Sequence, residues 1–214
     1  NIIKTQGLTR RFGRLTAVNG VDLRVPEASV YGFLGPNGAG KTTTLEMLEC
    51  ISSPTSGSIT YEGRCLDRAF REEIGIQFQT TALQDFQTVR ESLDMFASLY
   101  RRTADREELV QMCNLAEILD RDTRKLSGGQ RQRISIARAL MVDPEFVVAD
   151  EPVSALDVSI QAQILNLLME AQEKRGLTYM FITHYLSVVE HISTRVAVMY
   201  LGTVCELAPA RKLF

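Results

Sequence analysis

The chain has 214 residues, of which 45% are apolar and 23% charged, and its formal net charge is −2. This length is enough for one large domain with a sizeable core. The nearly balanced charge gives no electrostatic reason to expect nucleic acid or an anionic membrane surface as the main partner. No apolar run approaches the length of about 18 residues that a membrane-spanning helix needs, so we expect no direct membrane span.

The first sixty residues are typical of strands and turns. The segment "TAVNGVDLRV" alternates around Asn19-Gly20, a dipeptide that favours a β-hairpin. The short apolar run "VYGFLG" ends in glycine, as a buried strand would. After a glycine-rich loop, "KTTTLEMLECI" predicts a helix, and "SPTSGSITYEG" predicts a turn followed by a strand.

The middle of the chain predicts helices, because apolar residues recur there at helical spacing. One such stripe consists of Val89, Leu93, Phe96, Ala97 and Tyr100, and a second of Leu109, Met112, Cys113 and Ala116. Further along, "EFVVAD", "TYMFIT" and "RVAVMY" predict buried strands, and an amphipathic helix lies between the first two. The four cysteines are far apart and lack metal-ligand spacing, so we expect reduced, buried thiols.

Alternation of strands and helices at both ends of the chain predicts an α/β fold with a mostly parallel sheet and flanking helices. We expect a single domain over residues 1–214. Its core would comprise about 1–80 and 143–214, with an antiparallel β subdomain at the N-terminal end. An inserted helical subdomain would comprise about 81–142.

The segment "GPNGAGKT" follows a predicted strand, opens a predicted helix and matches G-x-x-x-x-G-K-[ST] in full. Glycines let the backbone turn its N–H groups around an anion, and the helix start adds its donors and dipole. The lysine can reach the β- and γ-phosphates, and the following threonine can ligate Mg²⁺. A plain glycine-rich turn is the alternative, which the strand–loop–helix context disfavours. The predicted nucleotide-binding residues are Gly35, Pro36, Asn37, Gly38, Ala39, Gly40, Lys41, Thr42 and Thr43.

Two carboxylates follow the buried strand in "FVVADEP". Ligands of open α/β sheets bind at the carboxyl ends of strands. We expect Asp150 to hold Mg²⁺ through water and Glu151, which points elsewhere, to be the base for an attacking water. An apolar run followed by "DE" is weak support alone, and the phosphate loop strengthens it. His184 follows another predicted strand, and this position favours a catalytic over a structural role.

The segment "LSGGQ" at residues 126–130 begins a predicted helix with two glycines, although glycine is a poor helix former. A Ser-Gly-Gly turn at a helix start offers a hydroxyl and free N–H groups to a phosphate. Lys41 already serves the phosphates from another helix of the same chain. An ordinary capped helix is the alternative interpretation.

Together, the phosphate loop, "LSGGQ", "VVADEP", "SALD" and the histidine after a strand resemble an ATP-binding cassette, the nucleotide-binding subunit of ABC transporters. The resemblance covers essentially the whole chain, and the combination is far more specific than any one motif. It implies a P-loop NTPase fold and an ATPase that uses ATP and Mg²⁺.

The resemblance also implies roles for individual residues. Phe12 falls where the family stacks an aromatic ring on adenine. Gln79 matches the glutamine that senses Mg²⁺ and the γ-phosphate and that joins the core to the helical subdomain. Asp150 matches the Mg²⁺ aspartate and Glu151 the catalytic base. His184 matches the histidine that contacts the γ-phosphate and orients the attacking water.

In this family two cassettes pack head to tail, and each signature segment caps the ATP held by the other's phosphate loop. The resemblance therefore implies that Ser127, Gly128, Gly129 and Gln130 are half of a site that a second copy completes. It places Asp157 in the loop that crosses the dimer interface.

The same resemblance implies partners and a location. A second ABC domain and transmembrane permease subunits are the expected partners, and no nucleic acid is expected. The permease would be driven through the surface near Gln79 and the helical segment. The chain would then be cytoplasmic and peripheral at the inner face of the cell membrane.

Two features depart from the family pattern. Family members usually carry Asp directly after the histidine, whereas this chain has Tyr185, which predicts slower turnover with intact nucleotide binding. Up to about residue 130 the sequence resembles drug- or antibiotic-exporter ATPases. The last 80 or so residues resemble dipeptide and oligopeptide importer ATPases. A natural mosaic or an engineered chimera is the hypothesis that this difference suggests.

Two other classes of function remain as alternatives. A non-transport cassette acting in DNA repair or on ribosomes would carry coiled-coil or zinc insertions, or two cassettes per chain. A mosaic or engineered domain would fold and bind ATP without a physiological transporter. The presence of Glu151 argues against a domain that binds ATP but cannot hydrolyse it. A kinase of the same fold would need an acceptor pocket and would leave "LSGGQ" unexplained.

Overall fold

The computed structural model describes residues 1–67, 69–78, 82–154 and 156–214. These residues form two compact units. Unit 1 comprises Asn1–Arg71 and Thr178–Phe214, and unit 2 comprises Glu72–Leu177. Within the described residues, no helix combines the length and the apolarity that crossing a membrane requires.

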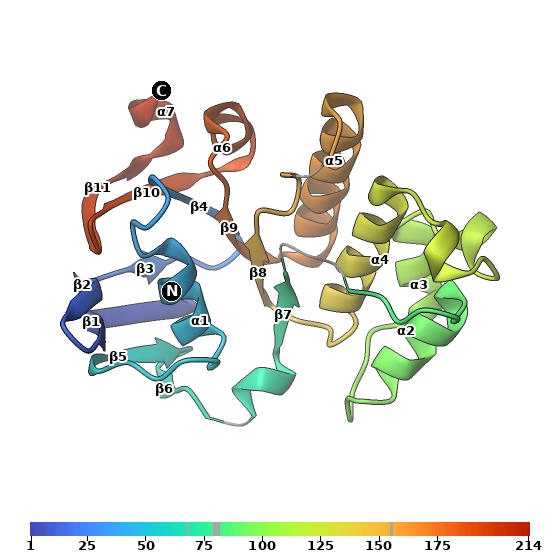
Figure 1. Ribbon diagram of the computed structural model, residues 1–214, viewed down its shortest axis with the longest axis horizontal. Coiled ribbons are helices and arrows are strands. Elements are labelled where there is room, and N and C mark those ends of the chain that lie inside the picture. Colours follow the sequence, from blue (N-terminus) through green and yellow to red (C-terminus); the bar gives the residue numbers. More distant parts are fainter. Residues whose placement is uncertain (68, 79–81, 155) are drawn as a thin grey trace. The chain divides into compact units, whose positions relative to one another are not determined.

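Unit 1 contains an antiparallel sheet whose central strand is the first of the chain. The order is β2-β1-β5-β6, and β3 also pairs with β1 (Figure 1). Strand β1 is central because its apolar side chains, such as Ile3 and Leu8, are fully buried. The strands are β1 (Ile3–Phe12), β2 (Leu15–Val21), β3 (Arg24–Val25), β5 (Ser56–Tyr61) and β6 (Arg64–Cys65).

The expectation of a hairpin at Asn19-Gly20 is wrong. The chain turns between β1 and β2, at residues 13–14, and β2 continues through the Asn-Gly pair. The register jumps there, from Leu8↔Val21 to Arg10↔Val18. Two residues of β2 therefore lie opposite one residue of β1, which makes the dipeptide a β-bulge. Gly20 has the positive φ (65°) that such a site favours, and its N–H donates to Thr9 Oγ1 at 3.0 Å.

The remaining strands of unit 1 lie in the order β11-β10-β4-β9. Strand β4 pairs in parallel with β10 and β9, whereas β11 is antiparallel to β10. Every residue of β4 and β9 is buried, as their continuous apolar sequences predict. The strands are β4 (Val30–Leu34), β9 (Thr178–Ile182), β10 (Arg195–Tyr200) and β11 (Thr203–Pro209).

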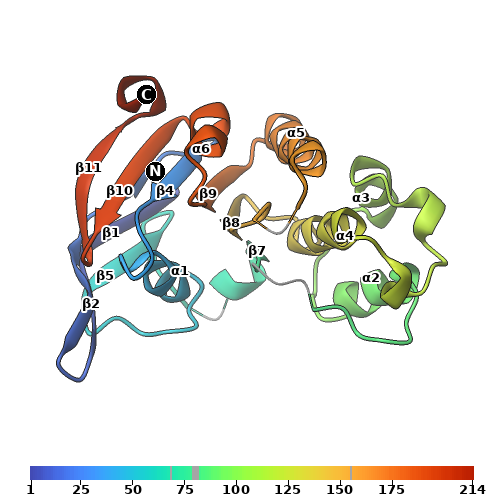
Figure 2. The same ribbon diagram turned by 45° about the horizontal axis from the view of Figure 1, so that its top comes forward.

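Helices complete unit 1. They are α1 (Lys41–Leu48), α6 (Leu186–Ile192) and α7 (Ala210–Leu213). Helices α6 and α7 cover β4 and β10 through a cluster of buried Leu34, Val189, Val196 and Ala210 (Figure 2). This packing fixes β4, and β4 carries the phosphate loop at its end.

Unit 2 combines a pair of parallel strands with the helices predicted for the middle of the chain. Strands β7 (Ile74–Gln77) and β8 (Phe146–Asp150) run in register from Ile74↔Phe146 to Gln77↔Ala149. The helices are α2 (Val89–Ala97), α3 (Arg106–Met112), α4 (Gly128–Leu140) and α5 (Val158–Arg175). Short 3₁₀ turns are η1 (Phe70–Glu72), at the boundary of the two units, η2 (Ala116–Ile118) and η3 (Thr123–Lys125).

Helix α4 is the packing centre of unit 2. It contacts β7, α2, α3 and α5 (Figure 1). Its approach to β7 is so close that a Cβ on Gly75 would lie 2.4 Å from the main-chain oxygen of Ala139. The mixed α/β architecture of the sequence analysis is thus present. The predicted limits of a core and an inserted helical subdomain stay a prediction, since the two compact units divide at other residues.

Replacing Gly75 with Ala is expected to lower the free energy of unfolding by about 1–3 kcal/mol, because the new methyl group must push the α4 backbone away from β7. Urea unfolding followed by circular dichroism measures the change. Ser58→Ala, at an exposed strand position, is the control and should stay within about 0.5 kcal/mol of the parent. Equal stability of the Gly75 variant and the parent would show that α4 does not need this close approach.

Candidate functional site

The phosphate loop of unit 1 has the backbone that anion binding requires. It connects the buried strand β4 to α1, and Gly38 and Gly40 adopt φ of 80° and 98°. A Cβ on Gly40 would lie 2.3 Å from the main-chain oxygen of Ala17, so only glycine fits against β2. Gly38 has nothing within 4 Å of its Cβ position. The loop therefore packs closely against β2 at Gly40 and has free space around Gly38 at its tip. This arrangement can accommodate a nucleotide phosphate.

Lys41 is the first residue of α1 and is 7% exposed. Its Nζ donates to the main-chain oxygens of Gly35 at 2.8 Å and of Pro36 at 3.0 Å. The ammonium group is thus held inside the curve of the loop. A cation in that position can neutralise phosphate oxygens bound by the loop.

The other predicted residues of the loop take different places. Pro36 and Asn37 are exposed, whereas Ala39 is buried and its main-chain oxygen accepts from Gly202 N–H at 3.0 Å. Thr42 is exposed and Thr43 half-buried in the first turn of α1. The first N–H groups of a helix have no intrahelical acceptor, so this turn supplies donors to an anion.

Phe12 ends β1 and is 47% exposed. The Arg10 guanidinium lies over its ring, 4.7 Å from the centroid. An exposed ring with a cation on one side can stack an adenine on the other. The predicted stacking role stays a prediction.

His184 follows β9 and is exposed. Its ring centroid lies 4.1 Å from that of Tyr185. Tyr185 occupies the N-cap position of α6, and its side chain makes no capping hydrogen bond. The Asp that the family usually has at this position is a strong N-cap residue. With Tyr185 at this position, α6 begins without a side-chain cap directly beside the predicted catalytic histidine.

Unit 2 carries the predicted carboxylates at the end of β8. Four buried residues precede Asp150, which is half-buried. Glu151 adopts a positive φ of 44°, and its main-chain oxygen accepts from the N–H and the hydroxyl of Ser154 at 3.2 and 3.1 Å. Such backbone conformations cost energy and concentrate at functional sites. The different roles expected of Asp150 and Glu151 stay predictions.

The signature segment begins helix α4. Ser127 is the N-cap: its Oγ accepts from Gln130 N–H at 3.3 Å, and Gln130 Oε1 accepts from Ser127 N–H at 3.0 Å. This capping box uses a lone pair of the Ser127 hydroxyl and leaves its proton for donation. The N–H groups of Gly128 and Gly129 lie in the first helical turn, where no intrahelical acceptor exists.

The second glycine of the signature also has a packing reason. A Cβ on Gly129 would lie 2.7 Å from Ile160 Cγ2 of α5, whereas one on Gly128 would lie 3.4 Å from Leu156 Cδ2. The start of α4 thus packs directly against the start of α5. Asp157 occupies the N-cap position of α5, is exposed and makes no side-chain cap bond.

Gln79, predicted to be a catalytic and Mg²⁺-binding residue, lies outside the described residues. A nearby glutamine was missed by the sequence analysis. Gln77 ends β7, is 1% exposed, and neither atom of its amide has a hydrogen-bond partner within the described part of the chain. Its register partner is Ala149, the residue before Asp150. A polar side chain within the apolar strand "IGIQ" was the available signal.

Magnesium fits the residue types that the sequence predicts. No cluster of three or more His, Cys, Asp or Glu side chains occurs in the residues that the structure describes. Mg²⁺ usually binds through one or two protein oxygens together with substrate phosphates and water. Thr42, in the first turn of α1, and Asp150 offer oxygens of that kind, and each stays a predicted ligand.

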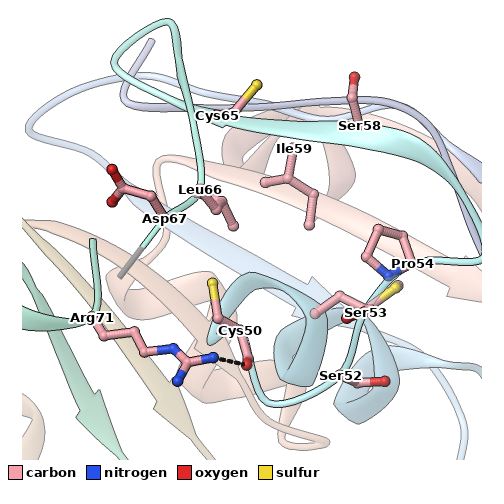
Figure 3. A pocket seen from close by; sticks show the side chains of 11 residues that line it. Cys50, Ser52, Ser53, Pro54, Ser58, Ile59, Cys65, Leu66, Asp67 and Arg71 are labelled. Carbon is pink, nitrogen blue, oxygen red and sulfur yellow. Dashed lines mark hydrogen bonds between the residues drawn. The ribbon is translucent and has the colours of Figure 1, made fainter. Parts of the chain in front are cut away.

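A separate cavity of about 480 Å³ opens where α1 ends, as Figure 3 shows. Its lining comes from the end of α1, the following loop, β5 and the segment after β6. Arg71 donates from Nη2 to the main-chain oxygen of Cys50 at 2.9 Å. None of the predicted nucleotide residues lines this cavity, so it is not the nucleotide site.

The expectation of buried thiols is wrong for most of the cysteines. Cys113 is buried, whereas Cys50 is half-buried and Cys65 and Cys205 are exposed.

Comparison with known proteins identifies the family of this chain. Residues 18–154 match the family model described as ABC transporter. The chain is 39% identical to the oligopeptide transport ATP-binding protein AppF of Bacillus subtilis, covering 96% of the chain and 68% of that protein. It is 40% identical to the dipeptide transport ATP-binding protein DppF of Escherichia coli, covering 92% and 64%. The chain thus spans about two thirds of the length of these relatives.

These matches do not support an exporter-like N-terminal half or a chimera. Each of the two peptide-transport proteins matches at least 92% of the chain, which includes both halves.

Solved structures of ATP-binding cassettes have the same fold as this chain. The ATP-binding cassette MJ0796, determined as a dimer bound to ADP and Pi, is 29% identical and superposes with a TM-score of 0.84 over 98% of this chain and 99% of its own. CbiO1 from Clostridium perfringens, part of an ABC transporter complex, is 28% identical, with a TM-score of 0.91 over 100% of this chain and 90% of its own. With its phosphate loop, its capped signature helix and these matches, the chain belongs to the ABC transporter family as an ATP-binding cassette domain.

Proposed function

We propose that this chain is the ATP-hydrolysing part of a peptide transporter. The observation that carries the proposal is the phosphate loop, which is closed against β2 at Gly40, open at Gly38 and holds Lys41 within its curve. The substrate class rests on similarity to oligopeptide and dipeptide transport proteins over at least 92% of the chain. That similarity does not favour a non-transport cassette.

The residues divide the work of hydrolysis between them. The loop N–H groups and Lys41 bind the phosphates of ATP, and Phe12 stacks on the adenine. Thr42, Asp150 and Gln79 would hold Mg²⁺, which would supply charge that offsets that of the phosphates. Glu151 accepts a proton from the attacking water, and His184 orients that water beside the γ-phosphate.

The signature acts on a second copy of the domain. Ser127 donates its hydroxyl proton, and Gly128 and Gly129 their N–H groups, to the γ-phosphate bound by the partner's loop. Supporting this proposal, the capping box with Gln130 orients the hydroxyl while leaving its proton available. Asp157, exposed at the start of α5, would meet the partner at the same interface.

We expect the permease to dock on the helical segment of unit 2. Phe86 is 78% exposed and Leu99 is 66% exposed, so both offer apolar area that a partner could cover. The Arg124 guanidinium lies over the Phe86 ring, 3.9 Å from its centroid. The chain would then work at the cytoplasmic face of the membrane.

Glu151→Gln removes the proposed base and keeps the size of the side chain. Phosphate release from ATP should fall at least about 100-fold, while nucleotide binding survives and an ATP-bound dimer accumulates. Steady-state phosphate release and light scattering with saturating ATP and Mg²⁺ measure the two effects. Glu145→Gln, an exposed position just before β8, makes the same charge change as a control. A Glu151→Gln protein that stays monomeric, or a control that loses activity equally, would contradict the proposal.

Two substitutions of Tyr185 test how the lack of a side-chain cap on α6 affects stability and ATP hydrolysis. Both Tyr185→Ala and Tyr185→Asp remove the ring contact with His184, but only Asp can accept an N–H of the first turn of α6. The Asp variant should be more stable than the Ala variant by about 0.5–2 kcal/mol. It should also hydrolyse ATP faster, since α6 would then fix the segment that carries His184. Thermal unfolding and turnover that are equal in the two variants would show that this position does not act as a cap.

A further inference from the structure

Unit 1 contains a cavity of about 670 Å³ that none of the predicted nucleotide residues lines. Its walls come from Asn1 and β1, from the segment that follows β2 and includes β3, and from one residue each of β10 and β11. Four of its eleven lining residues have charged side chains, and they are Lys4, Asp22, Arg24 and Arg195.

This cavity and the phosphate loop lie at opposite ends of the parallel strands. Arg195 begins β10 and pairs in register with Tyr31 near the amino end of β4. The phosphate loop starts at Gly35, at the carboxyl end of β4. Gly35 lies four residue steps along the chain from Tyr31, or roughly 13 Å in an extended strand. The cavity is therefore not part of the nucleotide site.

The charges that line the cavity are unbalanced. Three of its side chains are cations and one is a carboxylate, leaving aside the main-chain amino group of Asn1. That carboxylate, of Asp22, already accepts a hydrogen bond from Gly7 N–H at 2.6 Å. Within the described residues, no carboxylate forms an ion pair with any of the three cations. An excess of two positive charges thus faces the cavity.

Two of the cations lie opposite each other on neighbouring strands. Lys4 of β1 and Arg24 of β3 are direct register partners in an antiparallel pair. Side chains in that relation point to the same face, and like charges there are destabilising. An anion between them would turn this repulsion into attraction.

The third cation has unused hydrogen-bonding capacity. Arg195 Nε is buried and has no hydrogen-bond partner in the part of the chain described. The hydroxyl of the neighbouring Tyr31, a fully buried side chain, also has none. Burial raises the pKa of Tyr31 to about 12, with a smaller opposing effect from Arg195, so this hydroxyl stays a neutral donor at pH 7. Buried donors without acceptors are rare in native proteins and often mark a bound water or ion.

We propose that this cavity binds a phosphate group, either as free phosphate or as a small phosphomonoester. Lys4, Arg24 and Arg195 hold its oxygens, and the excess of two positive charges matches a dianion. The planar guanidinium groups can each donate two parallel hydrogen bonds to a phosphate, while the lysine contributes a point charge. The volume exceeds the needs of a bare phosphate and leaves room for the organic part of a small ester. The site does not depend on ATP hydrolysis by the same chain.

The test must first remove the competing phosphate loop, so all proteins carry Lys41→Ala. Melting temperature is measured against sodium phosphate, glycerol phosphate, and sodium chloride at equal ionic strength, and isothermal titration calorimetry gives the dissociation constants. We expect a saturable rise in melting temperature with at least one phosphate compound and none with chloride. Tighter binding of glycerol phosphate identifies a phosphomonoester site, and tighter binding of inorganic phosphate identifies a site for the free anion.

Variants then locate the binding. Lys4→Gln with Arg24→Gln should weaken phosphate binding by about tenfold or more, because charge-assisted hydrogen bonds are lost. Both side chains are at least partly exposed, so this double variant should fold. Arg195→Gln should weaken binding similarly. Arg101→Gln with Arg121→Gln removes two exposed charges in unit 2 and should leave binding unchanged. No effect of either phosphate compound beyond chloride would overturn the proposal, as would unchanged affinity in the Lys4 and Arg24 double variant.

Discussion

The start of α1 can receive a phosphate because Gly40 has no side chain. Its position is set by β2, whose Ala17 oxygen lies 2.3 Å from where a Cβ would be, and its φ of 98° turns the chain from the loop into the helix. A larger residue would push the loop away from β2 and turn the first N–H groups of α1 elsewhere. The packing of β4 under α6 and α7 holds the other end of the loop. Nucleotide binding in unit 1 thus depends on one close contact between a loop and a strand.

In unit 2 a glycine likewise allows a close contact, here between the starts of helices α4 and α5. Gly129 allows α4 to start against Ile160 of α5, and the Ser127 cap fixes the direction of the first turn. The segment between β8 and α5 is tied to this pair. Gln132 of α4 donates to the main-chain oxygen of Pro152, and Gln161 of α5 donates to those of Val153 and Leu156. Hydrogen bonds therefore connect the helix that carries the signature, the segment after Glu151 and the start of α5.

Much of this could be predicted from the sequence, because the relevant signals are local. The phosphate loop, the buried strands and the helical stripes each occupy a few consecutive residues whose types are dictated by backbone conformation or burial. The prediction failed where a distant partner decides the outcome. Asn19-Gly20 has hairpin chemistry, yet the pairing of β1 with β2 makes it a bulge. The packing role of Gly129 depends on Ile160, about thirty residues away. The position of Gln77 within the apolar strand "IGIQ" indicates burial, but the lack of a partner for its amide depends on the surrounding structure.

If two copies of the domain share each ATP site, mixing two inactive variants of this chain should restore ATP hydrolysis. Lys41→Ala disables the phosphate loop, and Ser127→Asp keeps the helix cap while placing a negative charge against the partner's γ-phosphate. A dimer of one copy of each has one site in which the loop and the signature are both intact. The account predicts that the mixture hydrolyses ATP faster than the two proteins measured separately, increasingly so at higher protein concentration. A mixture no more active than the sum of its parts would contradict a shared site.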